Sequence, residues 1–306
     1  MRSVSAHLEA DIHGTADIVL LVSAAVTGTA TISEELDLRI DDVPVPVTAL
    51  YGPHGTRVHT LTGAPGRLTV RYRADIPTPA MDIDHDGSAV ADASGAQPGP
   101  FAFINPGNPA VAASDPLDVV TYRLPSRYVE SDTLVGLATS ELRGLTGTDL
   151  LNGARDWVAE RFTYVPGSTR FSDSVRDVLL SRRGVCRDYA HVLAGLLRAV
   201  DVPARLVSVY APGLVPMDFH AVVEAYHEGR WYVLDATGLA PRTSLVRIAT
   251  GRDAADTAFM STYGGGVTLR TLRVTASSDD AAAVGDGTAS AEHPGADDPH
   301  ALVLLP

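Results

Sequence analysis

Cys186 is the only cysteine in the chain, and it stands where a loop is expected to turn into a helix. Gly184 gives the backbone conformational freedom just before it. Apolar residues then recur at helical spacing until Asp201-Val202-Pro203 ends the run: Val192, Leu193, Leu196, Leu197 and Val200. A helix N-terminus carries unpaired N–H groups and partial positive charge, and both lower the pKa of a thiol. The position therefore predicts a nucleophilic cysteine.

A histidine and an aspartate further along the chain could complete a thiol mechanism. Residues 219–227 and 231–235 have the side-chain pattern of strands, and Glu228-Gly229 between them predicts a two-residue hairpin turn. In that register Asp235 faces Val222, so His220 and Asp235 are diagonal neighbours on one face, roughly 7–8 Å apart at the backbone. We expect Asp235 to orient the imidazole and His220 to take the proton of Cys186 or to pair with its thiolate. Spacing alone does not place Cys186 beside His220.

Each of these residues also has a plainer interpretation. A lone cysteine is often a small buried hydrophobe, His220 could be a strand histidine at a loop edge, and Asp235 could only cap the turn that follows it. A zinc site made of these three side chains lacks a fourth ligand. The oxyanion donor stays open: the N–H of Cys186 is a natural one, and Trp157 and Tyr189 are side-chain candidates.

Three more titratable residues lie near the predicted nucleophile and base. Asp188 and His191 are three residues apart on the expected helix, so their side chains can interact with each other. Both rotate away from the Cys186 face at the helical period, which favours structural support over catalysis. Glu224 shares the His220 face of its strand and could support the site from behind.

The sequence divides into four regions with different predicted secondary structure, which together must position these residues. Residues 1–75 read as strands and predict a small antiparallel β domain. Residues 76–125 predict a linker, and within it 81–87 resembles a calcium loop without the required downstream Glu. Residues 126–275, with helices, the cysteine helix and strands, form the expected catalytic domain. Residues 276–306 are an acidic Ala, Asp and Gly-rich tail. Within it, 277–300 is expected to be disordered or loosely attached, whereas the apolar end, 301–306, could add an edge strand.

Composition excludes some classes of partner. The formal net charge of −13 over 306 residues argues against nucleic acid, because phosphate contacts need clustered Lys and Arg. One cysteine rules out an intramolecular disulfide framework and is compatible with a reducing compartment. The first residues lack the apolar core of a signal peptide, and no stretch is long and apolar enough to span a membrane. We expect a cytoplasmic protein without membrane contact.

Three blocks of residues together resemble the bacterial transglutaminase-like superfamily. They occur in the order typical of that family: Gly184-Val185-Cys186-Arg187-Asp188-Tyr189-Ala190-His191, Phe219-His220-Ala221-Val222-Val223-Glu224 and Asp235-Ala236-Thr237. The resemblance implies an α+β fold with a papain-like core, in which the cysteine helix packs on an antiparallel sheet, preceded by a small antiparallel β domain. It also implies a Cys186–His220–Asp235 triad without metal or cofactor. One departure is Asp235-Ala236, where the family often has Asp-Pro.

The chemistry and the resemblance together predict a thiol-dependent acyl-transfer enzyme. Cys186 would attack a carbonyl and form an acyl-enzyme thioester, with a peptide, protein or acyl thioester as substrate. Water as acceptor makes the enzyme a peptidase or amidase, and we favour this for a peptide-like amide. The alternatives are a transferase that uses an amine acceptor or a carrier-bound thioester, and a binding module without catalysis.

Overall fold

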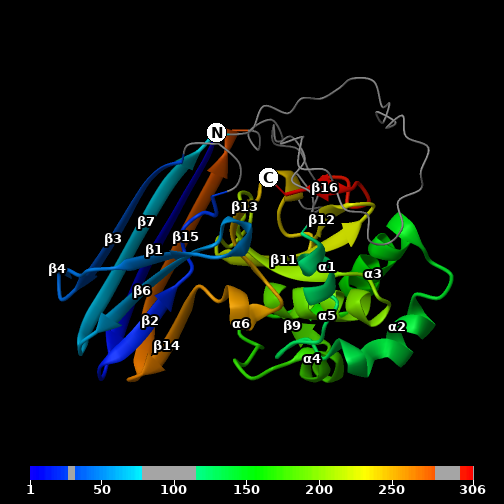
Figure 1. Cartoon of the computed structure of the whole chain (residues 1–306), viewed down its shortest axis with the longest axis horizontal. Coiled ribbons are helices and arrows are strands. Elements are labelled where there is room, and N and C mark those ends of the chain that lie inside the picture. The colour runs from blue at the N-terminus through cyan, green and yellow to red at the C-terminus, as the bar shows by residue number, and fades with distance from the viewer. Residues whose placement is uncertain (27–31, 78–114, 280–296, 306) are drawn as a thin grey trace.

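The computed structural model describes residues 1–26, 32–77, 115–279 and 297–305. A two-sheet β sandwich lies beside a sheet that is covered by helices (Figure 1). The fold is α+β, with the cysteine helix packed on an antiparallel sheet and a small β unit at the amino terminus, as the sequence predicts. Residues 81–87, which only resemble a calcium loop, and most of the predicted linker lie outside the described residues.

The sandwich is made of two antiparallel sheets. One has the order β15-β1-β7-β3-β4 and the other β14-β2-β6-β5. In β1 every second residue is buried, from Arg2 through Val4, Ala6, Leu8 and Ala10 to Ile12, and this alternation fixes which face of the strand meets the other sheet. The strands are β1 Arg2–Ile12, β2 Ala16–Leu20, β3 Ser33–Ile40, β4 Val43–Pro44, β5 Thr48–Tyr51, β6 Arg57–Gly63, β7 Gly66–Ile76, β14 Met260–Gly264 and β15 Val267–Ser278, with the short helix η1 Pro53–Gly55 between β5 and β6.

Two strands from far along the chain complete the sandwich. β15 pairs with β1 along its whole length, and β14 pairs with β2. The predicted boundaries at 75, 125 and 275 stay a prediction. The strand pairing favours a division in which residues 260–278 belong with the amino-terminal sheets rather than with the catalytic unit.

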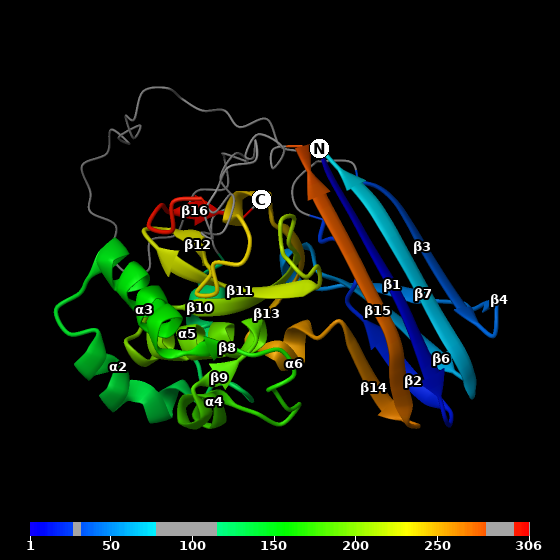
Figure 2. The ribbon, with the colours of Figure 1, turned by 180° about the vertical axis from the view of Figure 1, so that it is seen from behind.

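The second unit is a mixed layer of helices on one antiparallel sheet, ordered β13-β10-β11-β12-β16. Helix α5 lies against β11 and β10, and α2, α3 and α4 surround it (Figure 2). Leu193, Leu196 and Leu197 of α5 are fully buried, so the helix is the centre of this core. The elements are α1 Pro116–Thr121, η2 Ser131–Leu134, α2 Val135–Glu141, α3 Gly147–Arg161, β8 Thr163–Tyr164, α4 Val175–Ser181, β9 Arg183–Gly184, α5 Cys186–Ala199, β10 Ala204–Tyr210, β11 Phe219–His227, β12 Arg230–Leu234, η3 Arg242–Ser244, β13 Val246–Gly251, α6 Ala254–Thr257 and β16 Val303–Leu304.

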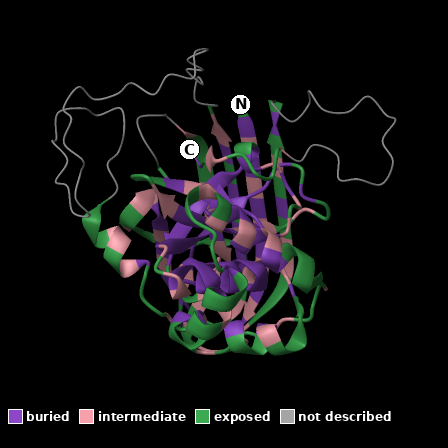
Figure 3. Ribbon diagram, turned by 90° about the vertical axis from the view of Figure 1, so that its right-hand side faces the viewer, coloured by how far each residue is buried: buried purple, intermediate pink, exposed green. Residues whose placement is uncertain are grey.

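The two units share buried surface. Tyr210, Val246, Ile248 and Ala249 of the second sheet belong to the apolar core of the sandwich. Figure 3 shows the buried residues in the middle of the molecule, with exposed residues around them. The Tyr210 hydroxyl also donates to the carbonyl of Val22 at 2.6 Å. The sandwich therefore packs directly against the sheet of the catalytic unit.

The prediction of a loosely attached tail is wrong for its described end. Residues 297–305 lie against α3, η3 and β12, and β16 pairs antiparallel with β12, with Tyr232 opposite Leu304 and Val233 opposite Val303. The edge strand suggested by the apolar end of the sequence is present. Arg155 and Arg242 donate hydrogen bonds to backbone carbonyls just before β16. Charge composition alone did not indicate these contacts.

Candidate active site

Helix α5 places Cys186 at its first position, with a turn fixed by side-chain capping. Val185 precedes the helix in an extended conformation, and Asp188 at the third helical position accepts the Val185 N–H at 2.8 Å. The Thr169 hydroxyl donates to the same carboxylate, and Arg187 pairs with it at 3.3 Å. Asp188 is buried whereas Cys186 is partly exposed. The thiol thus stands at a rigid helix N-terminus with access to solvent.

Glycine is required at position 184 because a side chain would not fit there, and not because the backbone needs conformational freedom. Its φ does not lie in the left-handed region, but a Cβ added to it would come within 2.5 Å of the Asp188 Cβ. Here the short strand β9 runs parallel to β8, with Tyr164 opposite Gly184, and Val165 donates its N–H to the Gly184 carbonyl at 2.9 Å. Close approach of the capping carboxylate is what excludes a side chain at this position.

The β11–β12 hairpin has the predicted register. Val223 faces Leu234 and Glu224 faces Val233, and the turn residues Glu228 and Gly229 have φ values of 47° and 83°. Positive φ at both positions is the type I′ turn that suits a two-residue hairpin. This register sets His220 and Asp235 diagonally on the same face.

His220 and Asp235 form a buried hydrogen bond. His220 Nε2 lies 2.8 Å from Asp235 Oδ2, and the two side chains are 0% and 3% exposed. Thr237 donates its N–H and its hydroxyl to Asp235 Oδ1 at 2.8 and 2.7 Å, so both carboxylate oxygens are held. His220 Nδ1 is buried without a hydrogen-bond partner among the described residues. That nitrogen is the one available to a thiol.

Electrostatics favour the charged imidazole. Burial disfavours the cation, but the charge and hydrogen bond of Asp235 outweigh it, and together with the neighbouring Cys186 they raise the pKa of His220 to about 10. Burial acts against ionisation of Asp235 too, yet His220 and Thr237 hold the pKa of that carboxyl below its usual value. At neutral pH the pair is an imidazolium beside a carboxylate.

Tyr164 is a site residue that the sequence did not single out. Burial and then the proximity of Cys186, with a smaller contribution from the charge of Asp218, raise the pKa of Tyr164 to about 12, so its hydroxyl stays protonated at neutral pH. The ring of Tyr164 is 38% exposed. Only the parallel β8–β9 pairing brings Tyr164 to the thiol, and a pairing of two residues leaves no signal in the sequence.

Of the two aromatic candidates for an oxyanion donor, Trp157 is engaged elsewhere, while Tyr189 packs among aromatic rings that include Tyr164. The Trp157 indole N–H donates to Glu141 at 2.7 Å. Tyr189 is buried, with its ring centroid 6.1 Å from that of Phe162 and 5.9 Å from that of Tyr164. Among these aromatic residues, Tyr164 is the one that meets both the thiol and solvent.

The geometry agrees with comparisons to known proteins. The model of the transglutaminase-like superfamily matches residues 143–236, which contain Cys186, His220 and Asp235. This part of the chain therefore resembles the transglutaminase-like superfamily. The crystal structure of a "putative cysteine protease" from Cytophaga hutchinsonii is similar to this chain with a TM-score of 0.75 and 28% identity, over 98% of this chain and 95% of that chain.

Two mycobacterial relatives of the transglutaminase-like chain are uncharacterized proteins. ML0607 of Mycobacterium leprae is 25% identical over 62% of this chain and 71% of its own length. Rv2569c of Mycobacterium tuberculosis is 38% identical over 31% of this chain and 35% of its own length, so that likeness concerns only a part of each protein.

The residues predicted as supports in this transglutaminase-like core each have partners of their own. Asp188 caps α5, while His191 Nε2 accepts the Ala254 N–H at 3.1 Å and its ring stacks on Tyr128, so the two side chains do not bond to each other. Burial lowers the pKa of His191 to about 3, which keeps the ring neutral. Glu224 is buried between Arg205 and Arg247, at 2.7 and 2.6 Å. These contacts are structural.

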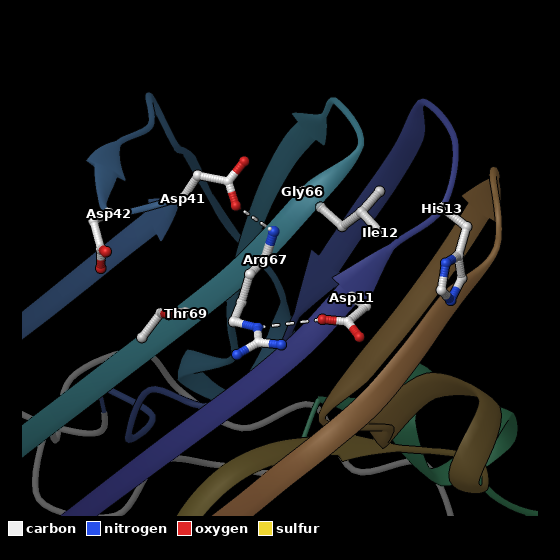
Figure 4. Close-up of a pocket in the computed structure, with 8 residues that line it drawn as sticks. All are labelled: Asp11, Ile12, His13, Asp41, Asp42, Gly66, Arg67 and Thr69. Carbon is white, nitrogen blue, oxygen red and sulfur yellow. Dashed lines mark hydrogen bonds and ion pairs between the residues drawn. The ribbon is translucent and has the colours of Figure 1, made fainter.

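A hollow of about 580 Å³ lies away from the thiol, at one end of the sandwich (Figure 4). Two of its three carboxylates are already engaged: Asp11 pairs with Arg67 at 3.3 Å and with Arg270 at 2.6 Å, and Asp41 accepts the Arg67 N–H at 2.8 Å. Within the described part of the chain, no three His, Cys, Asp or Glu side chains form a metal-binding group. In the same ranges, no helix has the length and apolar character needed to cross a membrane.

Proposed function

We propose that this transglutaminase-like chain is a thiol acyl-transfer enzyme that hydrolyses a peptide-like amide. Cys186 is the proposed nucleophile, His220 the proton carrier and Asp235 the residue that orients it. The observation that carries the proposal is the buried His220–Asp235 hydrogen bond of 2.8 Å, which leaves Nδ1 of the same ring for the thiol at the start of α5.

The proposed steps follow from that geometry. The Cys186 thiolate adds to the substrate carbonyl, and the resulting oxyanion receives hydrogen bonds from the Cys186 N–H and the Tyr164 hydroxyl. His220 then gives its proton to the leaving amine as the C–N bond breaks, which leaves a thioester on Cys186. Neutral His220 takes a proton from water as the water adds to the thioester, and the acid product leaves with the thiolate restored.

A second candidate uses an amine in place of water. Asp218 lies two residues before His220 with an exposed carboxylate, and its charge acts on both Tyr164 and His220. A negative charge at the entrance to the thiol would attract an ammonium group, which favours a cationic amine acceptor. Transfer from a carrier-bound thioester and a non-catalytic binding role remain alternatives, and the cytoplasm remains the proposed location.

The first experiment measures alkylation of the single cysteine by iodoacetamide as a function of pH. We expect the folded wild type to react well below the free-thiol pKa of about 8.5, and His220→Ala to lose that low-pH reactivity. The urea-unfolded protein supplies the reference titration, and Asp235→Asn is expected to fall between the two. Equal profiles for wild type and His220→Ala would remove the basis of the proposal.

A second assay separates the two acceptors. Peptides are incubated with the enzyme with and without a fluorescent primary amine, and products are identified by mass spectrometry, with Cys186→Ser as the blank. Hydrolysis without amine incorporation supports the peptidase. Preferential incorporation that Asp218→Asn weakens supports the transferase.

A further inference from the structure

Residues 297–305, here called the C-terminal strap, cross the part of the catalytic unit that carries Asp235. The strap runs past η3 and α3 and ends as β16 on the outer edge of β12 (Figures 1 and 2). Asp235 is the first residue after β12, so the strap pairs with the strand that delivers this carboxylate. Leu305 is buried beside Val233 and Val222 in a small apolar cluster.

Arg242 is the link between the strap and the end of β12. Its guanidinium donates to the Val233 carbonyl at 2.9 Å and to the Asp298 carbonyl at 2.7 Å, and its Nε lies 3.3 Å from Asp297 Oδ2. The side chain is 3% exposed. A buried guanidinium without these acceptors is strongly unfavourable, so the strap and the β12 end are held in one fixed arrangement.

Arg155 and Asn152 of α3 bind the next carbonyls of the strap. Arg155 donates to the carbonyl of Pro299, and Asn152 donates to that of His300 at 3.3 Å. A cavity of about 40 Å³ remains between these groups, and Arg155, Arg242, Asp297 and Asp235 are among the residues that line it. The strap therefore closes the rear of the aspartate that holds His220.

We infer that Arg242 and the C-terminal strap are positioning elements of the catalytic site, which hold Asp235 at hydrogen-bond distance from His220. Donation to Val233, two residues before Asp235, fixes the strand end, and the strap prevents that end from moving outward. This inference rests on the proposed function for its kinetic consequence, but its structural consequence, the state of the imidazole, is measurable without a substrate.

The test uses the full chain with Arg242→Gln, and Arg230→Gln as the matched control, since Arg230 begins the same strand with an exposed side chain. The His220 ring is followed by NMR in histidine-labelled protein and assigned by its loss in His220→Gln. We expect Arg242→Gln to lower the pKa of His220 by one unit or more and kcat at least tenfold with KM little changed. Arg230→Gln is expected to match wild type in both.

One further variant keeps the test decisive. Should Arg242→Gln fail to fold, Asp297→Asn removes only the charge of the ion pair with Arg242 and keeps the shape of the side chain. A smaller decrease in the pKa of His220 is then expected. A lowered melting temperature with an unchanged His220 titration would overturn the inference, because a merely structural strap has that effect. A wild-type His220 that titrates near 6.5 would instead contradict the thiolate–imidazolium pair from which the proposed reaction starts.

Discussion

His220 holds its two ring nitrogens in different environments. Nε2 is fixed by Asp235, whereas Nδ1 is buried without a partner among the described residues and faces the only thiol of the chain. An imidazole kept in one orientation by a carboxylate can exchange a proton with a thiol without reorganising. The proposed reactivity therefore depends on this ring more than on any property of Cys186 alone.

The raised pKa of His220 predicts a specific pH dependence of stability. Because the folded-state pKa of about 10 lies above the unfolded value of 6.5, the contribution of the imidazolium is fully present below pH 6.5 and is lost as pH rises toward 10. Even a one-unit difference corresponds to about 1.4 kcal/mol. Urea unfolding at pH 6.5 and pH 9.5 measures this contribution to the free energy of unfolding. The measurement uses a Cys186→Ala background so that the thiol does not titrate.

The comparison for that measurement is His220→Gln in the same background. We expect the free energy of unfolding of the parent to fall more steeply between the two pH values than that of the variant. Parallel pH profiles would mean that His220 is not a stabilising cation in the folded state.

We expect the Tyr164 hydroxyl to affect kcat but not the reactivity of the Cys186 thiol toward iodoacetamide. Tyr164→Phe removes the hydroxyl proposed as an oxyanion donor, for which a loss of about 10²-fold in kcat is typical, while iodoacetamide reactivity stays near wild type. The control is Tyr189→Phe, the neighbouring buried ring, 5.9 Å away. Equal kinetics for the two variants would remove Tyr164 from the proposed mechanism.

Much of the site could be predicted residue by residue. The hairpin turn and strand alternation determine that His220 and Asp235 share a face, because a slip of one residue would separate them. The position of Tyr164 could not be predicted, since it depends on a two-residue parallel pairing too short to leave a pattern in the sequence. The reason for Gly184 was also hidden, because it is a steric contact with Asp188 rather than a backbone angle.

The turn into α5 is the element most sensitive to a small change. Gly184→Ala would put a Cβ 2.5 Å from the Asp188 Cβ, and overpacking of this kind costs about 1–3 kcal/mol. Because Asp188 caps the helix that begins at Cys186, we also expect slower alkylation of the thiol. Thermal unfolding and the alkylation rate are measured on the same protein.

Gly136 in α2 is the matched control, since an added Cβ there meets nothing within 4 Å. Gly136→Ala should stabilise the protein by about 0.5–1 kcal/mol through helix propensity. A Gly184→Ala protein as stable and as reactive as this control would show that the capped turn tolerates a side chain.

Individual elements were more predictable than their assembly. Helical periodicity and caps indicate α3 and α5, and alternation indicates β6, β7, β10 and β11. The pairing of β1 with β15 was not predictable, because strand partners far apart in sequence are chosen by tertiary packing. The strap was missed for a related reason: its anchors are backbone carbonyls bound by arginines, and any sequence supplies carbonyls.

At the scale of the whole molecule, the sandwich and the catalytic unit are joined by apolar contacts and by hydrogen bonds. Tyr210, Val246 and Ile248 extend into the sandwich core. At the same boundary Arg205 contacts His54 at 3.3 Å and Glu224 at 2.7 Å. Buried contacts of this kind couple the unfolding of two units into one transition.

A core substitution in the sandwich should therefore also lower the stability of the catalytic unit. Leu8→Ala removes a side chain that is 1% exposed, which costs about 2–5 kcal/mol. Both tryptophans, Trp157 and Trp231, lie in the catalytic unit, so fluorescence follows that unit alone. We expect the fluorescence and circular dichroism transitions to move together to lower urea.

The control is Leu180→Ala, whose side chain is 86% exposed on α4 and should change stability by no more than about 0.5 kcal/mol. A fluorescence transition that stays in place while circular dichroism splits into two steps would mean that the units unfold independently.

The pairing of β1 with β15 has a consequence for how the protein is made. β1 must wait for β15, which leaves the ribosome some tens of seconds later at roughly 5–20 residues per second. During that interval β1 exposes an unpaired strand edge to the surrounding proteins, while α5, β10 and β11 can already associate. Nascent chains of this protein are therefore expected to need a chaperone at their amino-terminal strands, until residues 267–278 are released.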